Sequence, residues 1–136
     1  MKSLFVIALL LGSSAAYAAS NSPFKCNPAG NQAELNQCAF DDYQAADKKL
    51  NDTWKKLLTK FKSDKTATSK LKAAQKAWIV FRDAEIEAMF ACDNQEMNCW
   101  GSMEPMLRYG ELAALTQTRT QRLQKYITQG LGVPMN

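Results

Sequence analysis

The sequence has 136 residues, with 17 lysines and arginines against 13 aspartates and glutamates, and it contains no histidine. The lack of histidine excludes Ser-His-Asp and Cys-His catalytic arrangements and imidazole metal sites. The sequence also has no P-loop and no G-x-G-x-x-G fingerprint, so we expect no cofactor and no enzymatic activity.

The first 18 residues have the pattern of a secretory signal peptide. A positively charged start precedes an apolar stretch from Leu4 to Leu11, and Ala16 to Ala18 form an A-x-A cleavage site. The apolar stretch is too short to span a bilayer well, and no later segment is suitable. We therefore expect cleavage near Ala18 and a periplasmic or secreted protein. Residues 19–136 are expected to form a single domain.

Four cysteines follow the predicted cleavage site: Cys26, Cys38, Cys92 and Cys99. Export to an oxidising compartment favours two disulfides. We favour the two local pairs, Cys26 with Cys38 and Cys92 with Cys99. A rival pairing stays open because the helical hairpin described below brings Cys38 near Cys92. A zinc site is disfavoured, since the sequence has no C-x-x-C and no histidine.

The first predicted helix starts at Asn31, a good N-cap residue, with Glu34 at the capping-box position. Its apolar residues recur every three or four positions, which is the period of a helix with one buried face. They are Leu35, Ala39, Tyr43, Ala46, Leu50, Trp54, Leu57 and Phe61. The polar stretch from Ser63 to Ser69 predicts a turn.

The second predicted helix ends near Phe90, and a break from Cys92 to Gly101 follows. Its apolar residues are Leu71, Ala74, Trp78, Ile79, Phe81, Ile86 and Phe90. The third helix is expected to begin near Ser102 and to end before Gly130. With no convincing strand, the sequence predicts an all-α fold. We expect a three-helix antiparallel bundle, made of a long helical hairpin plus a third helix, with two disulfides.

Folding the hairpin about Asp64 and Lys65 gives a register for the first two helices. Three pairs then lie opposite each other: Leu50 and Ile79, Trp54 and Gln75, and Asp47 and Arg82. We interpret Asp47, Asn51, Gln75 and Arg82 as a structural polar network in which an Asp47–Arg82 ion pair fixes the register. Trp54, Trp78 and Phe81 are expected in the core. Trp100 is either a lid on the end of the core or an exposed contact residue.

Charge is distributed unevenly along the chain. Residues 31–47 hold four acids and no base, residues 48–76 hold ten lysines and two aspartates, and residues 83–111 hold seven acids and one arginine. The fold should therefore have an acidic end and a lysine-rich tip. Solvated surface explains such charges without a function. As a hypothesis, Asp93, Glu96, Trp100 and Glu104 form a preorganised contact for a cationic partner.

Two motifs resemble the LprI-type lysozyme inhibitor family, in its small helical domain. The first is A-D-x-x-L-N-x-x-W, from Ala46 to Trp54, and the second runs from Leu71 to Asp83 and contains A-Q-x-A-W-I-x-F-R-D. The spacing of Cys26 and Cys38, Gly101-Ser102 and Thr116-x-x-Arg119 extend the likeness. The resemblance implies an exported protein that binds and inhibits lysozyme, and so protects the cell wall.

The chain departs from the pattern of many similar proteins at two positions. Ile86 and Leu112 stand where many such proteins carry cysteines. Because both residues here are apolar, we expect a packing contact in place of one cross-link.

A different class of function is suggested by the ten lysines of residues 48–76. The lysine-rich hairpin tip could bind anionic lipid, lipopolysaccharide or wall polymer at the cell envelope. Nucleic acid would be attracted to the same lysines, but the predicted export argues against such a partner.

Overall fold

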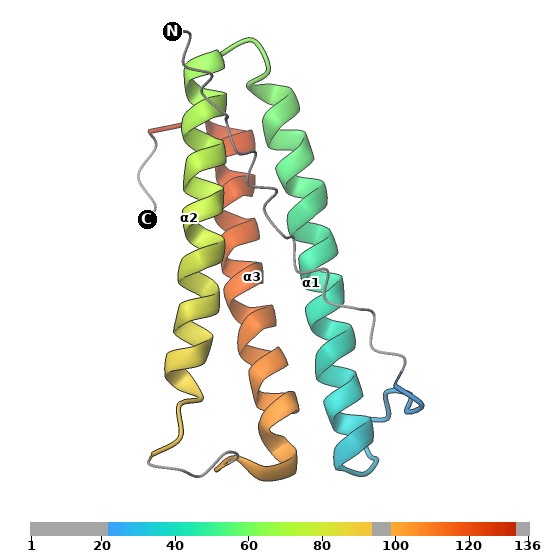
Figure 1. Cartoon of the computed structure of the whole chain (residues 1–136). Coiled ribbons are helices and arrows are strands. Elements are labelled where there is room, and N and C mark those ends of the chain that lie inside the picture. Colours follow the sequence, from blue (N-terminus) through green and yellow to red (C-terminus); the bar gives the residue numbers. More distant parts are fainter. Residues whose placement is uncertain (1–21, 94–98, 133–136) are drawn as a thin grey trace, which may run out of the picture.

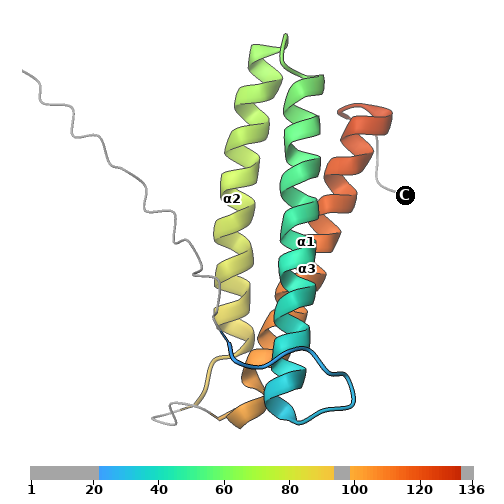
Figure 2. The same cartoon turned by 90° about the vertical axis from the view of Figure 1, so that its right-hand side faces the viewer.

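The computed structural model describes residues 22–93 and 99–132. It contains three long helices, α1 (Gln32–Lys60), α2 (Lys65–Met89) and α3 (Glu104–Gln129), and a short 3-10 helix, η1 (Gly101–Met103). The three helices run antiparallel to their chain neighbours and form one elongated bundle (Figures 1 and 2). The predicted all-α bundle is confirmed. Within the described ranges, none of the helices is both long and apolar enough to cross a membrane.

Local signals in the sequence set the helix ends. The side chain of Asn31 accepts hydrogen bonds from the backbone N–H groups of Ala33 and Glu34, and the Glu34 carboxylate accepts one from the N–H of Asn31 at 2.8 Å. The predicted capping box is therefore present. Asp64 caps α2 by accepting from the N–H of Ala67 at 2.8 Å. At Gly130, with φ of 95°, the chain leaves α3 in a conformation that favours glycine.

The closest helix packing is between α1 and α3. Both helices bury several small side chains; they are Ala46 and Thr53 of α1 and Ala113, Thr116 and Thr120 of α3. The Thr120 hydroxyl donates to the carbonyl oxygen of Thr116 at 2.9 Å, so this polar group is satisfied inside its own helix. Small side chains let the two helix backbones approach closely, and α2 then covers one side of the α1–α3 pair (Figure 1).

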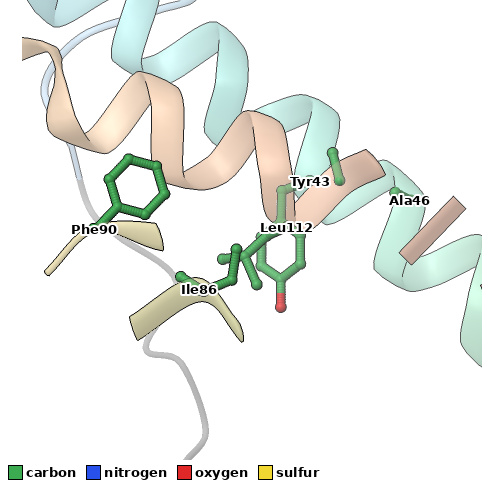
Figure 3. Packing of buried hydrophobic residues seen from close by; sticks show 6 residues of the cluster. Tyr43, Ala46, Ile86, Phe90 and Leu112 are labelled. Atoms are coloured by element: carbon green, nitrogen blue, oxygen red, sulfur yellow. The ribbon is translucent and has the colours of Figure 1, made fainter. Parts of the chain in front are cut away.

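The core consists of two clusters, each built from all three helices. The cluster next to the break between α2 and α3 contains Tyr43, Ala46, Ile86, Phe90, Leu112 and Ala113 (Figure 3). The cluster nearer the turn between α1 and α2 contains Leu50, Leu57, Leu71 and Leu123, with Trp54 and Trp78 packed against it. Ile86 and Leu112 are both buried in the first cluster and lie against each other, which confirms the expected packing contact (Figure 3).

The predicted pairing of Leu50 with Ile79 is wrong. Leu50 packs with Leu57, Leu71 and Leu123, whereas its predicted partner Ile79 is 42% exposed. Phe81, expected in the core, is 56% exposed. The cause is α3, which takes up the buried face of α1. Only the side of α2 that carries Leu71, Arg82 and Ile86 then points inward.

The predicted Asp47–Arg82 ion pair is also wrong. Arg82 is buried, and its Nη2 lies 2.7 Å from Oδ1 of its neighbour Asp83. Asp47 accepts a hydrogen bond from Asn51 within α1, at 2.9 Å. A paired, hydrogen-bonded neighbour compensates the buried guanidinium without any help from α1.

The partner predicted for Gln75 is also wrong. Its Oε1 accepts from Nε of Arg119 on α3, at 2.9 Å, and not from Asn51 or Trp54. The guanidinium groups of Arg82 and Arg119 lie 5.3 Å and 5.7 Å from the Trp78 ring centroid. The hydrogen bond between Gln75 and Arg119 thus joins α2 to α3, and both guanidinium groups lie within cation–π distance of the Trp78 ring.

The two disulfides pair Cys26 with Cys38 and Cys92 with Cys99. The local pairing is confirmed, and the rival pairing of Cys38 with Cys92 is excluded. The first disulfide ties the segment before α1 to the second turn of that helix. The second closes the break between α2 and α3.

Candidate functional site

The candidate site is the disulfide-closed end of the bundle, defined here as residues 91–93 and 99–103. The chain reaches it where α2 stops at Met89 and leaves it through η1. The Cys92–Cys99 disulfide joins the two sides, and the backbone N–H of Cys99 lies 3.1 Å from Sγ of Cys92. Gly101 has φ of 62°, a left-handed conformation that glycine adopts without steric cost. The main chain can therefore turn sharply after the disulfide and enter α3.

Trp100 is both a lid on the core and an exposed residue. Its ring packs edge-to-face on the buried ring of Phe90, with the centroids 5.4 Å apart. Nevertheless, 41% of Trp100 is exposed to solvent. The edge-to-face contact holds the indole in place, so an aromatic surface is presented without much freedom left to lose on binding.

Arg108 of α3 contacts residues on both sides of the disulfide-closed end. Its guanidinium lies 5.1 Å from the Phe90 ring centroid. Nη1 is 2.6 Å from Oε1 of Glu87 on α2, and Nη2 is 3.0 Å from Oε1 of Glu104. Partial burial lowers the pKa of Arg108, but the hydrogen bonds to Glu87 and Glu104 outweigh that effect, and the net shift is upward. One arginine thus neutralises part of two carboxylates and connects α2 with α3.

The first turns of α1 also hold the disulfide-closed end. Nδ2 of Asn36 donates to the carbonyl oxygen of Ser102 at 3.0 Å. Nε2 of Gln32 lies 3.8 Å from Sδ of Met106, just beyond η1. All three helices therefore fix the position of η1 and of the neighbouring Trp100.

The predicted contact residues have different surroundings. Asp93 and Trp100 are exposed and lie on either side of the disulfide. Glu104 is only partly exposed and is occupied by Arg108, so it contributes less negative charge than the sequence suggested. Glu96 lies outside the described residues. That these side chains bind a partner stays a prediction.

The two ends of the bundle differ in charge. The start of α1, the end of α2 and the start of α3 meet at the disulfide-closed end, while the turn between α1 and α2 lies at the opposite end (Figure 1). The acidic segments predicted from sequence therefore gather at one end, and the lysine-rich segment forms the other. All ten lysines of residues 48–76 are exposed. Such separation orients a charged partner as it approaches.

A groove lies away from this end, between α1 and α3. It is lined mainly by alanines, glutamines and Gly110, and its titratable residues are Asp42, Lys49 and Lys125. This set contains no nucleophile beside a base and no close pair of carboxylates. Within residues 22–93 and 99–132, no group of three or more metal-ligating side chains is present.

Sequence reasoning missed the contacts of Arg108 and Arg119, the two arginines that join α3 to α2. Arg119 is half-buried, and burial lowers its pKa. The sequence did contain one signal for Arg119, namely its position on the helix. Arg119 lies on the same side of α3 as the buried residues Leu112, Thr116 and Leu123. A charged side chain on that side requires a partner.

Two comparisons relate the chain to known proteins. The family model described as "Lysozyme inhibitor LprI" matches residues 25–123. The chain belongs to the LprI family. An uncharacterised protein of Rhizobium meliloti (strain 1021) is 38% identical over 131 residues, which cover 88% of this chain and 90% of that protein. No solved structure matches the chain. The LprI match includes both motifs that carried the resemblance and ends at Leu123, in the second core cluster.

Proposed function

We propose that this LprI protein is exported, with residues 1–18 as a cleaved signal peptide, and that it binds and inhibits lysozyme in the periplasm or outside the cell. Family membership supports this proposal. Two disulfides are typical of an oxidising compartment. The protein acts by occupying lysozyme and carries out no reaction of its own.

The proposed contact surface is the disulfide-closed end, and the exposure of the fixed Trp100 is the observation that carries it. Tryptophan is enriched among the residues that dominate binding energies at protein interfaces. Trp100 is held by Phe90 at 5.4 Å, and η1 beside it is tied to α1 by Asn36. Because animal-type lysozymes are usually cationic, the acids near this end attract them. Asp93 and Glu96 mainly steer the encounter, and Trp100 supplies the lasting contact.

Binding kinetics with purified lysozyme test this division of roles. The variant Asp93→Lys/Glu96→Lys should slow association at low salt by about tenfold and change dissociation little. Trp100→Ala should mainly speed dissociation. The charge-matched control Asp42→Lys/Glu111→Lys changes exposed acids on α1 and α3 and should leave the dissociation rate unchanged. Wild-type kinetics in both test variants would exclude the disulfide-closed end as the contact surface.

A second candidate is binding to an anionic envelope surface through the lysine-rich tip. The exposure of all ten lysines between residues 48 and 76 favours it. Sedimentation with vesicles of anionic lipid at low ionic strength tests this candidate. Protein that stays in the supernatant would eliminate it, whereas salt-sensitive sedimentation would support it.

A further inference from the structure

The outward side of α2 is an exposed apolar face that no other helix covers. Its residues are Ala73, Ala74, Ala77, Val80, Phe81, Ala84 and Ala88, and all of them are exposed. At about 100° per residue they span an arc of roughly 120°. At about 1.5 Å per residue the face is about 22 Å long. In both views α2 lies at the edge of the bundle (Figures 1 and 2).

Two large side chains occupy the middle of this face. Val80 is 64% exposed and Phe81 is 56% exposed. The remaining members are alanines, which lie on both sides of the central pair along the helix. A solvent-exposed helix normally carries polar residues here. Alanines flanking a central apolar pair instead allow a second helix to approach closely and to bury Val80 and Phe81.

The charged residues along one edge of the face indicate the identity of the second helix that would pack against it. Going along α2, this edge carries Lys72, Lys76, Asp83 and Glu87. The midpoint between Lys72 and Glu87 coincides with the midpoint between Lys76 and Asp83, and both fall between Ile79 and Val80. A twofold axis at that point brings each lysine opposite the matching carboxylate of an identical, antiparallel α2.

Both carboxylates retain an oxygen for such a contact. Within one molecule, Arg82 contacts Oδ1 of Asp83 and Arg108 contacts Oε1 of Glu87. Among the contacts of the described residues, Oδ2 of Asp83 and Oε2 of Glu87 are not used. The internal ion pairs also hold the carboxylates at the edge of the face, where a lysine of a second molecule can reach them.

We infer that α2 is the interface of a homodimer in which two copies of this chain pack their α2 helices antiparallel. A twofold interface must be self-complementary. If one residue of the first copy contacts a second residue of the other copy, the same two residues must also be in contact with the copies exchanged. The shared midpoint of the two charge pairs meets that requirement, and an unrelated partner does not need it. The inference does not depend on lysozyme binding.

The size of the face determines how tightly the dimer is expected to bind. A single pair of helix faces of this length buries well under the roughly 1,600 Å² of a standard interface. The dimer is therefore weak, with a dissociation constant on the order of 10 µM. The two lysine–carboxylate pairs contribute mainly to orientation and register.

Sedimentation equilibrium of the processed, oxidised protein, from about 1 µM to about 500 µM, brackets that constant. The wild type should change from monomer to dimer. Lys72→Glu and Glu87→Lys should each weaken dimerisation at least tenfold, since each places like charges opposite each other. An equimolar mixture of these two variants should dimerise again. In the mixed dimer the two introduced side chains have opposite charge and face each other across the axis, and the unchanged Glu87 of one variant faces the unchanged Lys72 of the other.

Further variants separate the interface from effects on folding. Val80→Glu/Phe81→Glu should remain helical by circular dichroism and be monomeric throughout. Lys56→Glu on α1 and Glu111→Lys on α3 change exposed charges away from the face and should dimerise like the wild type. A wild type that is monomeric at every concentration overturns the inference, as does a mixture of the two charge variants that stays monomeric. Loss of lysozyme inhibition in Val80→Glu/Phe81→Glu, with a monomeric wild type, would assign the face to lysozyme instead.

Discussion

Ile86 of α2 lies against Leu112 of α3 in the buried cluster next to the disulfide-closed end (Figure 3). By the family resemblance, these are the two positions where many similar proteins carry cysteines. An apolar contact therefore joins α2 to α3 where many similar proteins are expected to have a covalent bond. The substitution is physically reasonable, since two buried aliphatic side chains contribute free energy comparable to that of a disulfide.

This relationship predicts that a third disulfide can be introduced. Ile86→Cys/Leu112→Cys should form a cross-link during oxidative folding, so that thiol titration finds no free cysteine. The closed loop favours folding by about 3 kcal/mol, and the loss of two aliphatic side chains offsets much of that gain. We expect a thermal midpoint close to that of the wild type. Two titratable thiols in the folded variant would show that the side chains are not adjacent.

The difference in burial between Leu57 and Ile79 predicts unequal effects of their truncation. Leu57→Ala should lower the free energy of unfolding by about 3 kcal/mol, because Leu57 is fully buried and its truncation leaves a cavity. Ile79→Ala should lower it by less than about 1 kcal/mol, because Ile79 is 42% exposed. Urea denaturation measures both. Equal losses would favour the Leu50–Ile79 pairing predicted from sequence.

The polar network predicts which pairs are energetically coupled. A double-mutant cycle with Arg119→Met and Gln75→Met should give a coupling of about 1 kcal/mol, since these side chains are hydrogen-bonded at 2.9 Å. A cycle with Asp47→Asn and Arg82→Met serves as the control. Its coupling should be close to zero, because Arg82 is paired with Asp83 and Asp47 with Asn51. The opposite ranking would restore the Asp47–Arg82 pair.

The two disulfides should differ in what they support. Removing either one by paired Cys→Ser changes should cost about 2–3 kcal/mol, because both close short loops. Loss of Cys92–Cys99 should also weaken lysozyme inhibition, since it frees the main chain beside Trp100. Loss of Cys26–Cys38 should leave inhibition intact at temperatures where the variant is folded. Inhibition that depends on Cys26–Cys38 alone would place the contact surface elsewhere.

Most of the fold could be predicted from local signals. Asn31 with Glu34 indicated the start of α1 and Gly130 the end of α3. The predicted turn from Ser63 to Ser69 was too long, because Asp64 caps α2 and the helix already begins at Lys65. The helices are long and periodic, and export with four cysteines made two local disulfides the simplest arrangement. These signals arise from residues that are close together in the chain, so they can be detected in a single sequence.

The packing partners of each helix could not be predicted in the same way. The hairpin register assumed that α1 buries its stripe against α2. In the structure the small residues Thr53, Thr116 and Thr120 are buried, and α1 packs chiefly on α3. Threonines do not stand out in an apolar pattern. The exposed Phe81 looked like a core residue for the related reason that periodicity alone does not distinguish a covered from an uncovered apolar side.

The candidate site was predicted in part. Trp100 stood out because it lies in a break beside a cysteine, and its exposure agrees with a contact role. The support from Arg108 depends on distances between α2 and α3, which no sequence spacing reveals.

A turbidity assay of lysozyme acting on bacterial cell walls tests the central claim most directly. The processed, oxidised protein is added over a concentration series, with Trp100→Ala and the control Asp42→Lys/Glu111→Lys beside it. We predict saturable inhibition by the wild type and the control, and inhibition at least tenfold weaker for Trp100→Ala. Undiminished clearing of cell walls at a large molar excess of the wild type, for both cationic animal lysozyme and other lysozyme types, would contradict the account.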